Sequence, residues 1–333
     1  MPELPEVETI VRGLNQAIVG RKIRSIDVLV DKLFIGNKNK ILNSKILGVE
    51  RLGKTILIYF ENKYLLQIHL KMTGQLIFLE NKIKNSKLET RNSKQKPNSN
   101  FKIKNKIFRI SDFGFRISTQ GVVGGHPDKK YNQPLPHKYT HIIINFTDGS
   151  NLFYNDLRKF GWMAICQRQI EIKDKILNIK ISDQNLKLYQ QIIGIDALSN
   201  KLTPKYLTDK FKNRKITIKQ ALLDQSIISG IGNIYSDEIL FCAKILPYKK
   251  AGKLNESEIK TIIKFIPIIL NKSIDLGGTS RSDYIKIDGS RGDYFNHAFV
   301  YGRENKKCRK CNTKIKRIKI GQRSSHFCPN CQK

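Results

Sequence analysis

The sequence predicts an α+β fold with a β-rich first domain, a helical second domain and a small C-terminal segment held together by metal. Short apolar runs separated by turn residues fill residues 23–154, and apolar residues recur at helical spacing between 206 and 269. Four of the six cysteines lie after residue 303. The changes from a strand pattern to a helical pattern and then to a cysteine-rich segment divide the chain. They place the first domain at 1–166, a linker at 167–184, the second domain at 185–303 and the cysteine segment at 304–333.

The first domain begins with a predicted helix over residues 7–18, where apolar residues share one helical face and acidic residues stand at the start. Seven strand candidates follow, bounded by turn signals such as Asp148-Gly149-Ser150. Many short strands at this spacing favour a β-sandwich or a barrel-like domain. The candidates are residues 23–30, 46–51, 55–60, 64–69, 75–79, 141–146 and 151–154.

Residues 81–138 interrupt the strand pattern. They contain 14 Lys and Arg against three Asp and Glu, are rich in Asn, Ser and Gln, and repeat short motifs such as Phe108-Arg-Ile-Ser and Phe115-Arg-Ile-Ser. Because loops of this length are unusual inside compact domains, we interpret the segment as a low-complexity insertion with one hairpin near 106–118. The alternative is an added nucleic-acid-binding arm.

Helical periodicity characterises the second domain. Helices are predicted at residues 206–211, 218–223 and 239–243, and a further helix at 257–269 is expected to bend near Pro267. The terminal 30 residues are poor in apolar residues, so they need something other than a core to fold.

The terminal cysteines have the spacing of a four-thiolate zinc site. Two Cys-x2-Cys pairs are separated by 16 residues, and a basic segment with no acidic residue surrounds them. Disulfides are the alternative, but a cytosolic chain would keep its thiols reduced. We therefore predict one structural Zn²⁺ and no organic cofactor, with the ligands Cys308, Cys311, Cys328 and Cys331; Cys166 and Cys242 are expected to be core thiols.

The charge of the chain favours a polyanionic partner. Lys and Arg total 61 against 28 Asp and Glu, a formal net charge of +33. Part of this excess has a compositional explanation, because Lys, Asn and Ile are abundant together, as AT-rich coding produces. No apolar run approaches the roughly 20 residues that span a bilayer. The acidic start is unlike a secretory signal, which predicts a cytoplasmic protein.

The chain start offers a nucleophile. Removal of Met1 would leave Pro2 with a free secondary amine, and α-amino groups have a pKa near roughly 7.7–8.0, so a useful fraction is neutral at physiological pH. Attack on a sugar C1′ would give an iminium ion, with Glu3 beside it as a proton donor or base. The alternative is that the acidic residues here only favour the helix start.

Three anchors together resemble one family. They are Met1-Pro-Glu-Leu-Pro-Glu-Val-Glu-Thr9, Asn233 within Gly230-Ile-Gly-Asn-Ile-Tyr235, and the end Phe327-Cys-Pro-Asn-Cys-Gln332. The sequence thereby resembles the bacterial formamidopyrimidine-DNA glycosylases over nearly the whole chain except 81–138. The resemblance implies a monomeric bifunctional repair enzyme that acts on oxidised purines in double-stranded DNA. It further implies an N-terminal β-sandwich, a helix-two-turn-helix domain, a zinc-ribbon hairpin, and a lesion-capping loop between Gly277 and Arg303.

The resemblance assigns the catalytic roles. Pro2 matches the nucleophile that displaces the base and forms the Schiff base, and Glu3 matches the acid that assists sugar-ring opening. Lys54 matches a proton donor in β-elimination, although the local sequence alone favours an exposed turn lysine. Arg323 matches the arginine that holds the phosphates flanking the lesion and is linked to δ-elimination.

The DNA contacts are likewise implied by the resemblance. Met72 and Phe160 match wedges that fill the void left by the flipped nucleotide, and Arg158 matches the reader of the orphan cytosine. Lys159 replaces a phosphate-binding arginine and loses its bidentate fork. The remaining matches are Asn233 with Lys219 at backbone phosphates, Arg214 at a basic position, and Tyr139 where a DNA-contacting histidine is common.

Two other functions remain open from the residues. An endonuclease VIII-like enzyme for oxidised pyrimidines is the rival within the family, and Leu4, Arg158 and Phe160 argue against it. A non-catalytic zinc-ribbon protein that binds nucleic acid is the rival from another class, and retention of Met1 would support it.

Overall fold

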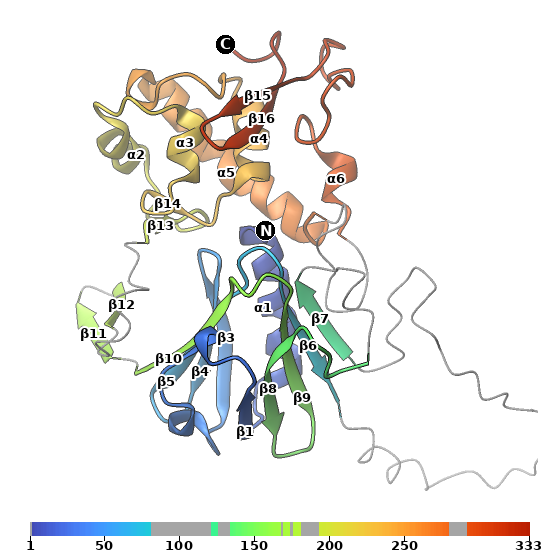
Figure 1. The fold of residues 1–333 in the computed structure, drawn as a ribbon. Helices are drawn as coiled ribbons and strands as arrows, with labels where there is room; N and C mark the ends of the chain where they lie inside the picture. The colour runs from blue at the N-terminus through green and yellow to red at the C-terminus, as the bar shows by residue number, and fades with distance from the viewer. Residues whose placement is uncertain are drawn as a thin grey trace, which may run out of the picture.

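A computed structural model describes residues 2–80, 121–125, 134–167, 169–173, 176–180, 193–279 and 292–333. The chain forms two lobes, and its N-terminus lies where they meet (Figure 1). The hairpin expected near 106–118, and the greater part of the expected capping loop, lie outside the described residues. In the described part of the chain, none of the helices has the length and apolar character needed to cross a membrane.

Helix α1 (Leu4–Ile18) joins the two lobes. It begins three residues before the predicted start, because Glu3 caps it and Pro5 fits the first turn. Leu4 packs into the core of the helical lobe, whereas Val7 and Ile10 pack into the sandwich core. The first turn of α1 is therefore held by one lobe and the rest of the helix by the other.

The first lobe consists of two five-stranded sheets that do not close into a barrel, which confirms the predicted sandwich. The strand orders are β1-β8-β9-β6-β7 and β2-β10-β5-β4-β3. Their bounds are β1 (Ile23–Val28), β2 (Phe34–Ile35), β3 (Ile46–Leu52), β4 (Thr55–Phe60), β5 (Tyr64–His69), β6 (Gly74–Leu79), β7 (Gly121–Gly125), β8 (Thr140–Phe146), β9 (Asn151–Asp156) and β10 (Trp162–Gln167), with short 3-10 helices at Asp31–Leu33 and Lys38–Ile41.

Strand β7 corrects the predicted insertion. Residues 121–125 fall within 81–138 but form an edge strand that pairs antiparallel with β6. The sequence Gly-Val-Val-Gly-Gly has too little side-chain alternation to indicate a strand. Gly125 allows β7 to lie close to β6, because a Cβ at this position would overlap the backbone of Gly74 and Gln75.

The second lobe is built from helices α2 (Pro204–Phe211), α3 (Ile218–Leu223), α4 (Asn233–Cys242), α5 (Glu256–Asp275) and α6 (Tyr294–His297), with a 3-10 turn at Ala251–Lys253 and the short parallel pair β13 (Ile195–Asp196) and β14 (Ile228–Ser229). Helix α4 starts six residues before the prediction. Its middle carries Ser236, Asp237 and Glu238, all buried, so the apolar pattern misses it. Helix α5 includes Pro267 and continues to Asp275.

Two further hairpins complete the fold. The expected linker contains β11 (Gln169–Lys173) and β12 (Ile176–Lys180), which pair antiparallel. At the C-terminus, β15 (Lys316–Ile320) and β16 (Arg323–Phe327) form the predicted basic hairpin. Cys308, Ile315 and Cys328 belong to the same apolar cluster as the helices, so the cysteine segment and the helical lobe share one core.

Candidate active site and nucleic-acid interface

Glu3 is buried against the start of α4. Its Oε1 accepts a hydrogen bond from the backbone N–H of Ile234 at 2.9 Å, and its Oε2 accepts from that of Tyr235 at 3.4 Å. A Cβ at Gly232 would overlap the Glu3 carboxyl group, so only glycine permits this approach. The backbone N–H groups that the sequence predicts to face an anion therefore bind a carboxylate of the same chain.

Lys54 lies in the same buried cluster. Its Nζ donates to the backbone oxygen of Ile231 at 2.9 Å, so it is not the exposed turn lysine that its local sequence favours. Burial raises the pKa of Glu3, which Lys54 opposes and Glu6 reinforces. Burial lowers the pKa of Lys54, which Glu3 opposes. Both shifts bring an acid and a base closer to neutral pH, as proton transfer requires.

Glu6 completes the cluster and was missed as a site residue. It accepts from the Tyr235 hydroxyl at 2.6 Å, from the backbone N–H of Thr279 at 2.9 Å and from that of Glu3 at 2.8 Å. The last contact is half of a capping box, so the Glu3-x-x-Glu6 spacing was an available signal. Glu6 thereby fixes Glu3 relative to both α4 and Thr279.

The predicted wedge residues contact one another. The Arg158 guanidinium carbon lies 4.6 Å from the centroid of the Phe160 ring, and its Nη1 lies 3.1 Å from Met72 Sδ. Met72 is 36% exposed and Phe160 is 54% exposed, which is unusual for large apolar side chains. Both side chains are therefore available to a partner surface.

A buried carboxylate shapes the loop that carries this wedge. Asp156 accepts from the backbone N–H groups of Arg158 at 3.1 Å, Phe160 at 2.9 Å and Gly161 at 2.8 Å. The hydroxyls of Thr73 and Tyr154 donate to it as well. These bonds hold the loop while it passes through a left-handed conformation at Lys159.

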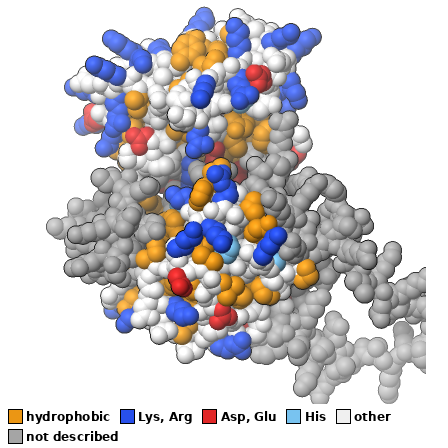
Figure 2. All heavy atoms as spheres, in the orientation of Figure 1, with side chains coloured by type: hydrophobic (Ala, Val, Ile, Leu, Met, Phe, Trp, Pro, Cys, Tyr) orange, Lys and Arg blue, Asp and Glu red, His pale blue; other side chains and the backbone are white. Residues whose placement is uncertain are grey.

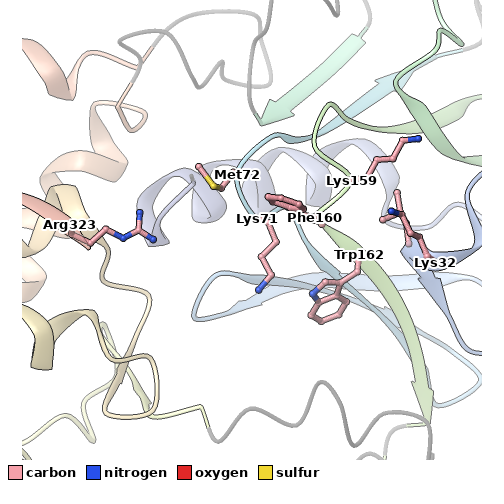
Figure 3. A pocket seen from close by; sticks show the side chains of 9 residues that line it. Lys32, Lys71, Met72, Lys159, Phe160, Trp162 and Arg323 are labelled. Atoms are coloured by element: carbon pink, nitrogen blue, oxygen red, sulfur yellow. The ribbon is translucent and has the colours of Figure 1, made fainter. Parts of the chain in front are cut away.

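The wedge borders a cleft of about 540 Å³ between the two lobes. Met72, Lys159, Phe160 and Trp162 line it from the sandwich, and Arg323 reaches toward Met72 from the zinc hairpin (Figure 3). Lys32, Lys71 and Trp162 were not identified from the sequence, because isolated lysines and a strand tryptophan carry no distinctive pattern. Lys and Arg side chains gather on the sandwich surface below the junction (Figure 2). The cleft is therefore cationic and apolar together, which suits a nucleic acid.

His69 is a further site residue that the sequence analysis did not select. It lies near Lys54 and Lys71, and its Nδ1 accepts from the backbone N–H of Lys71 at 3.0 Å. Burial, with the neighbouring positive charges, lowers the pKa of His69 to about 3. His69 is therefore neutral and carries a proton on only one ring nitrogen.

Lys219 departs from its expected place at the DNA surface. It is fully buried, and its Nζ donates to Asp237 Oδ1 at 2.6 Å and to the backbone oxygen of Asn233 at 2.8 Å. With these two partners Lys219 holds the turn before α4, and its contact with DNA stays a prediction. Asn233 itself is half-buried, and its Nδ2 lies 3.4 Å from the Tyr301 hydroxyl.

The two remaining predicted contacts lie outside the cleft lining. Tyr139 is half-buried, with the Lys138 Nζ 5.2 Å from its ring centroid. Arg214 donates from Nε to the backbone oxygen of Lys210 at 2.8 Å and pairs with Asp224 at 3.4 Å. The structure brings neither residue together with the wedge, and their DNA contacts stay predictions.

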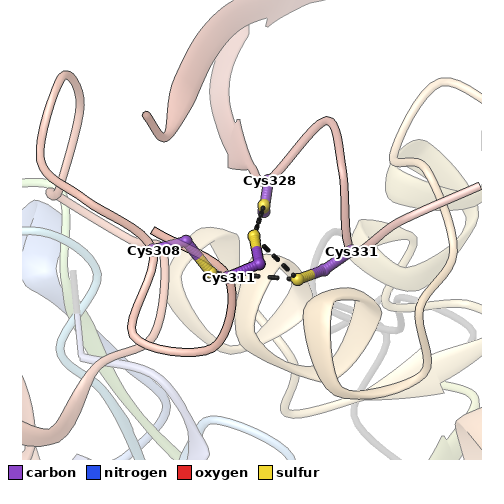
Figure 4. Close-up of side chains that lie close together, drawn as sticks. All are labelled: Cys308, Cys311, Cys328 and Cys331. Carbon is purple, nitrogen blue, oxygen red and sulfur yellow. Dashed lines mark hydrogen bonds between the residues drawn. The ribbon is translucent and has the colours of Figure 1, made fainter. Parts of the chain in front are cut away.

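The four terminal cysteines converge as predicted (Figure 4). All their Sγ atoms lie within 4.8 Å of one another, and the Cys311 Sγ is 3.4 Å from that of Cys328. Zn–S bonds of about 2.3 Å in a tetrahedron place sulfurs about 3.8 Å apart, so the four thiolates fit one zinc ion. The chain therefore has a structural zinc site in its C-terminal segment.

Comparison with known proteins agrees with this arrangement. Three family models match the chain: the formamidopyrimidine-DNA glycosylase N-terminal domain at residues 1–163, the H2TH domain of that enzyme at 193–284, and a zinc finger found in FPG and IleRS at 305–333. The formamidopyrimidine-DNA glycosylase of Prochlorococcus marinus is 33% identical over 345 aligned residues, covering 100% of both chains. That of Lactiplantibacillus plantarum is 33% identical, covering 99% of this chain and 98% of its own.

Solved structures of similar fold hold DNA. A Lactococcus lactis FPG mutant in complex with Fapy-dG-containing DNA superposes with a TM-score of 0.72 at 30% identity, with full coverage of both chains. The same enzyme with abasic-site DNA gives 0.71 at 28% identity, covering 99% of each chain. Fold, cleft and zinc hairpin thus define a DNA glycosylase that acts on damaged DNA. Within that class, the chain belongs to the formamidopyrimidine-DNA glycosylase family, whose members also have AP lyase activity.

Proposed function

We propose that the chain excises oxidised purines, namely 8-oxoguanine and formamidopyrimidines, from duplex DNA and then cleaves the strand by β,δ-elimination. The observation that carries this proposal is the buried pair of Glu3 and Lys54 beside Pro2, with the pKa of the acid raised and that of the base lowered. The Fapy-dG complex of the Lactococcus lactis relative supports the same substrate class.

The chemistry begins once Met1 is removed. The Pro2 nitrogen donates its lone pair to C1′, and the electrons of the C1′–base bond leave with the base; the proton lost from the Pro2 nitrogen balances the proton that the departing base takes up. The sugar ring then opens as the nitrogen–C1′ bond becomes an iminium, and Glu3 supplies the proton that O4′ needs. The raised pKa of Glu3 keeps that proton available at a higher pH than an ordinary glutamate would.

Strand cleavage follows from the iminium, which acts as an electron sink. Loss of a proton from C2′ expels the 3′-phosphate in the β-step, and a second elimination breaks the C5′–O bond and expels the 5′-phosphate. Lys54, with its lowered pKa, is suited to exchange protons in the first elimination. Arg323 lines the cleft and is suited to hold the phosphates and to assist the second.

The wedge accounts for recognition in this proposal. Met72 and Phe160 would fill the space of the flipped nucleotide, and Arg158 would donate to the orphan cytosine. Their mutual contacts support insertion of the three side chains as one unit. A preference for cytosine opposite the lesion is therefore expected, because Arg158 presents only donors.

Oxidised pyrimidines are a second candidate substrate. The wild-type Lactococcus lactis FPG has been solved in complex with DNA containing an oxidised pyrimidine, and it matches this chain with a TM-score of 0.70 at 30% identity over both full chains. The same nucleophile would serve both lesions, so the two differ only in how the flipped base is accommodated.

Borohydride trapping tests the proposal. Processed wild-type protein should form a covalent adduct with an 8-oxoguanine:cytosine duplex, and this adduct should disappear in Pro2→Ala and in protein that retains Met1. A parallel duplex with an oxidised pyrimidine measures the second candidate. If processed wild-type protein forms no adduct with either duplex, the chain is not the proposed lyase, and a non-catalytic DNA-binding role replaces it.

A further inference from the structure

Asp237 is a buried carboxylate that joins three parts of the helical lobe. It lies in the middle of α4 and is 1% exposed. Its Oδ1 accepts from Lys219 Nζ and from the Ser325 hydroxyl, each at 2.6 Å, and its Oδ2 accepts from the backbone N–H of His326 at 2.8 Å. One side chain thus ties α3, α4 and the zinc hairpin strand β16 together.

The ion pair makes this junction rigid. A buried charge is tolerated only with a counter-charge and further hydrogen bonds, and here Lys219 supplies the first and β16 the second. Lys219 also donates to the backbone oxygen of Asn233, where α4 begins. Sliding β16 along α4 would leave Asp237 paired with Lys219 but without the hydrogen bonds from Ser325 and His326, so the strand has one favourable position.

Strand β16 begins at Arg323, two residues before Ser325. Residues i and i+2 share a face of a strand, so the bond that holds Ser325 also fixes the direction in which Arg323 leaves the strand. Arg323 is exposed, and its guanidinium extends into the cleft (Figure 3). At its other end the strand runs into the zinc ligand Cys328, so the zinc site and Asp237 hold β16 at separate points.

The same helix also holds Glu3, through the N–H groups of Ile234 and Tyr235. Helix α4 therefore sets the distance between Glu3, which acts at the sugar, and Arg323, which acts at the phosphate. We infer that Asp237 is a positioning residue that aims Arg323 and thereby controls how far the reaction continues from the first elimination to the second. This inference rests on the proposed lyase function.

The test uses the full zinc-loaded chain with Met1 removed. Ser325→Ala deletes one strand-to-carboxylate bond and leaves the Lys219–Asp237 pair in place, and Ser324→Ala on the other face of β16 is the matched control. A duplex with a preformed abasic site is cleaved at saturating protein, and β- and δ-products are separated by gel. We expect the δ-to-β ratio to fall about tenfold in Ser325→Ala, as loss of one hydrogen bond to a charged group allows. Ser324→Ala should keep the wild-type ratio.

A second variant protects the test against misfolding. Lys219→Met combined with Asp237→Leu removes both buried charges together and releases β16 from α4. A wild-type product ratio in either folded variant overturns the inference, and so does a wild-type ratio in Arg323→Ala, because the inference requires Arg323 to act in the second elimination. Borohydride trapping by wild-type protein is measured in parallel, because its absence would refute the proposed lyase function and not the role of Asp237.

Discussion

Replacing Asp156 by Asn should loosen the wedge loop without changing its size. The carboxylate accepts from the backbone N–H groups of Phe160 and Gly161 through Oδ2, and the amide of Asn would present an N–H₂ group there. Two N–H groups would then lose their acceptor. Each unsatisfied group costs about 1–3 kcal/mol, and water can reach the exposed loop, so the free energy of unfolding should fall by about 2–4 kcal/mol.

The functional effect should appear in opposite-base selectivity. Phe160 and Arg158 would lose their fixed geometry, so Asp156→Asn should excise 8-oxoguanine opposite cytosine and opposite adenine at more similar rates. Urea unfolding and single-turnover excision measure the two effects, and Asp31→Asn, an exposed position on the same lobe, is the control. Wild-type selectivity together with a stability change below about 1 kcal/mol would refute the assigned role of Asp156.

Three further predictions follow from the site. Cys328→Ser should lose zinc and weaken DNA binding together, since this sulfur is also part of the helical core; undiminished DNA affinity in fully zinc-free protein would contradict this. Gly232→Ala should slow base excision at least about tenfold by displacing Glu3, whereas Gly48→Ala, where a Cβ meets nothing within 4 Å, should not. In the folded state His69 stays neutral down to about pH 3, whereas in the unfolded state it is protonated below its ordinary pKa of 6.5. The free energy of unfolding should therefore decrease as the pH is lowered below 6.5. Between pH 8 and pH 5 the loss from this group is about 2 kcal/mol, and chemical unfolding of His69→Gln should show a correspondingly smaller decrease.

Periodicity and spacing predicted those parts of the fold where one side of an element is buried. Strands 55–60 and 64–69 have the bounds that alternation and turn residues indicate, and the two cysteine pairs converge as their spacing requires. The resemblance led to Glu3, Lys54 and the wedge, which the structure gathers around one junction. These features could be predicted because they depend on the local residue pattern or on motifs that are visible in the sequence.

The polar network around α4 could not be predicted in this way. Asp237 and Glu238 are charged residues in positions where a helix pattern expects apolar ones, and their partners lie far away in the chain. The local sequence predicts that Lys219 is a surface cation, because it gives no sign that Asp237 lies opposite it. Such pairs are set by tertiary contacts between distant segments, and no local signal encodes them.

The position of α1 across the two cores couples the two lobes. A chain divided between the sandwich and the helices would still keep Leu4 inserted in the helical core, so the two fragments should remain associated and purify as one complex. The helical lobe expressed alone would lack Leu4 from its interior, whereas the sandwich core is built from residues 7–165 of its own lobe. The reactive end of the enzyme thus also serves as the connecting piece between the lobes.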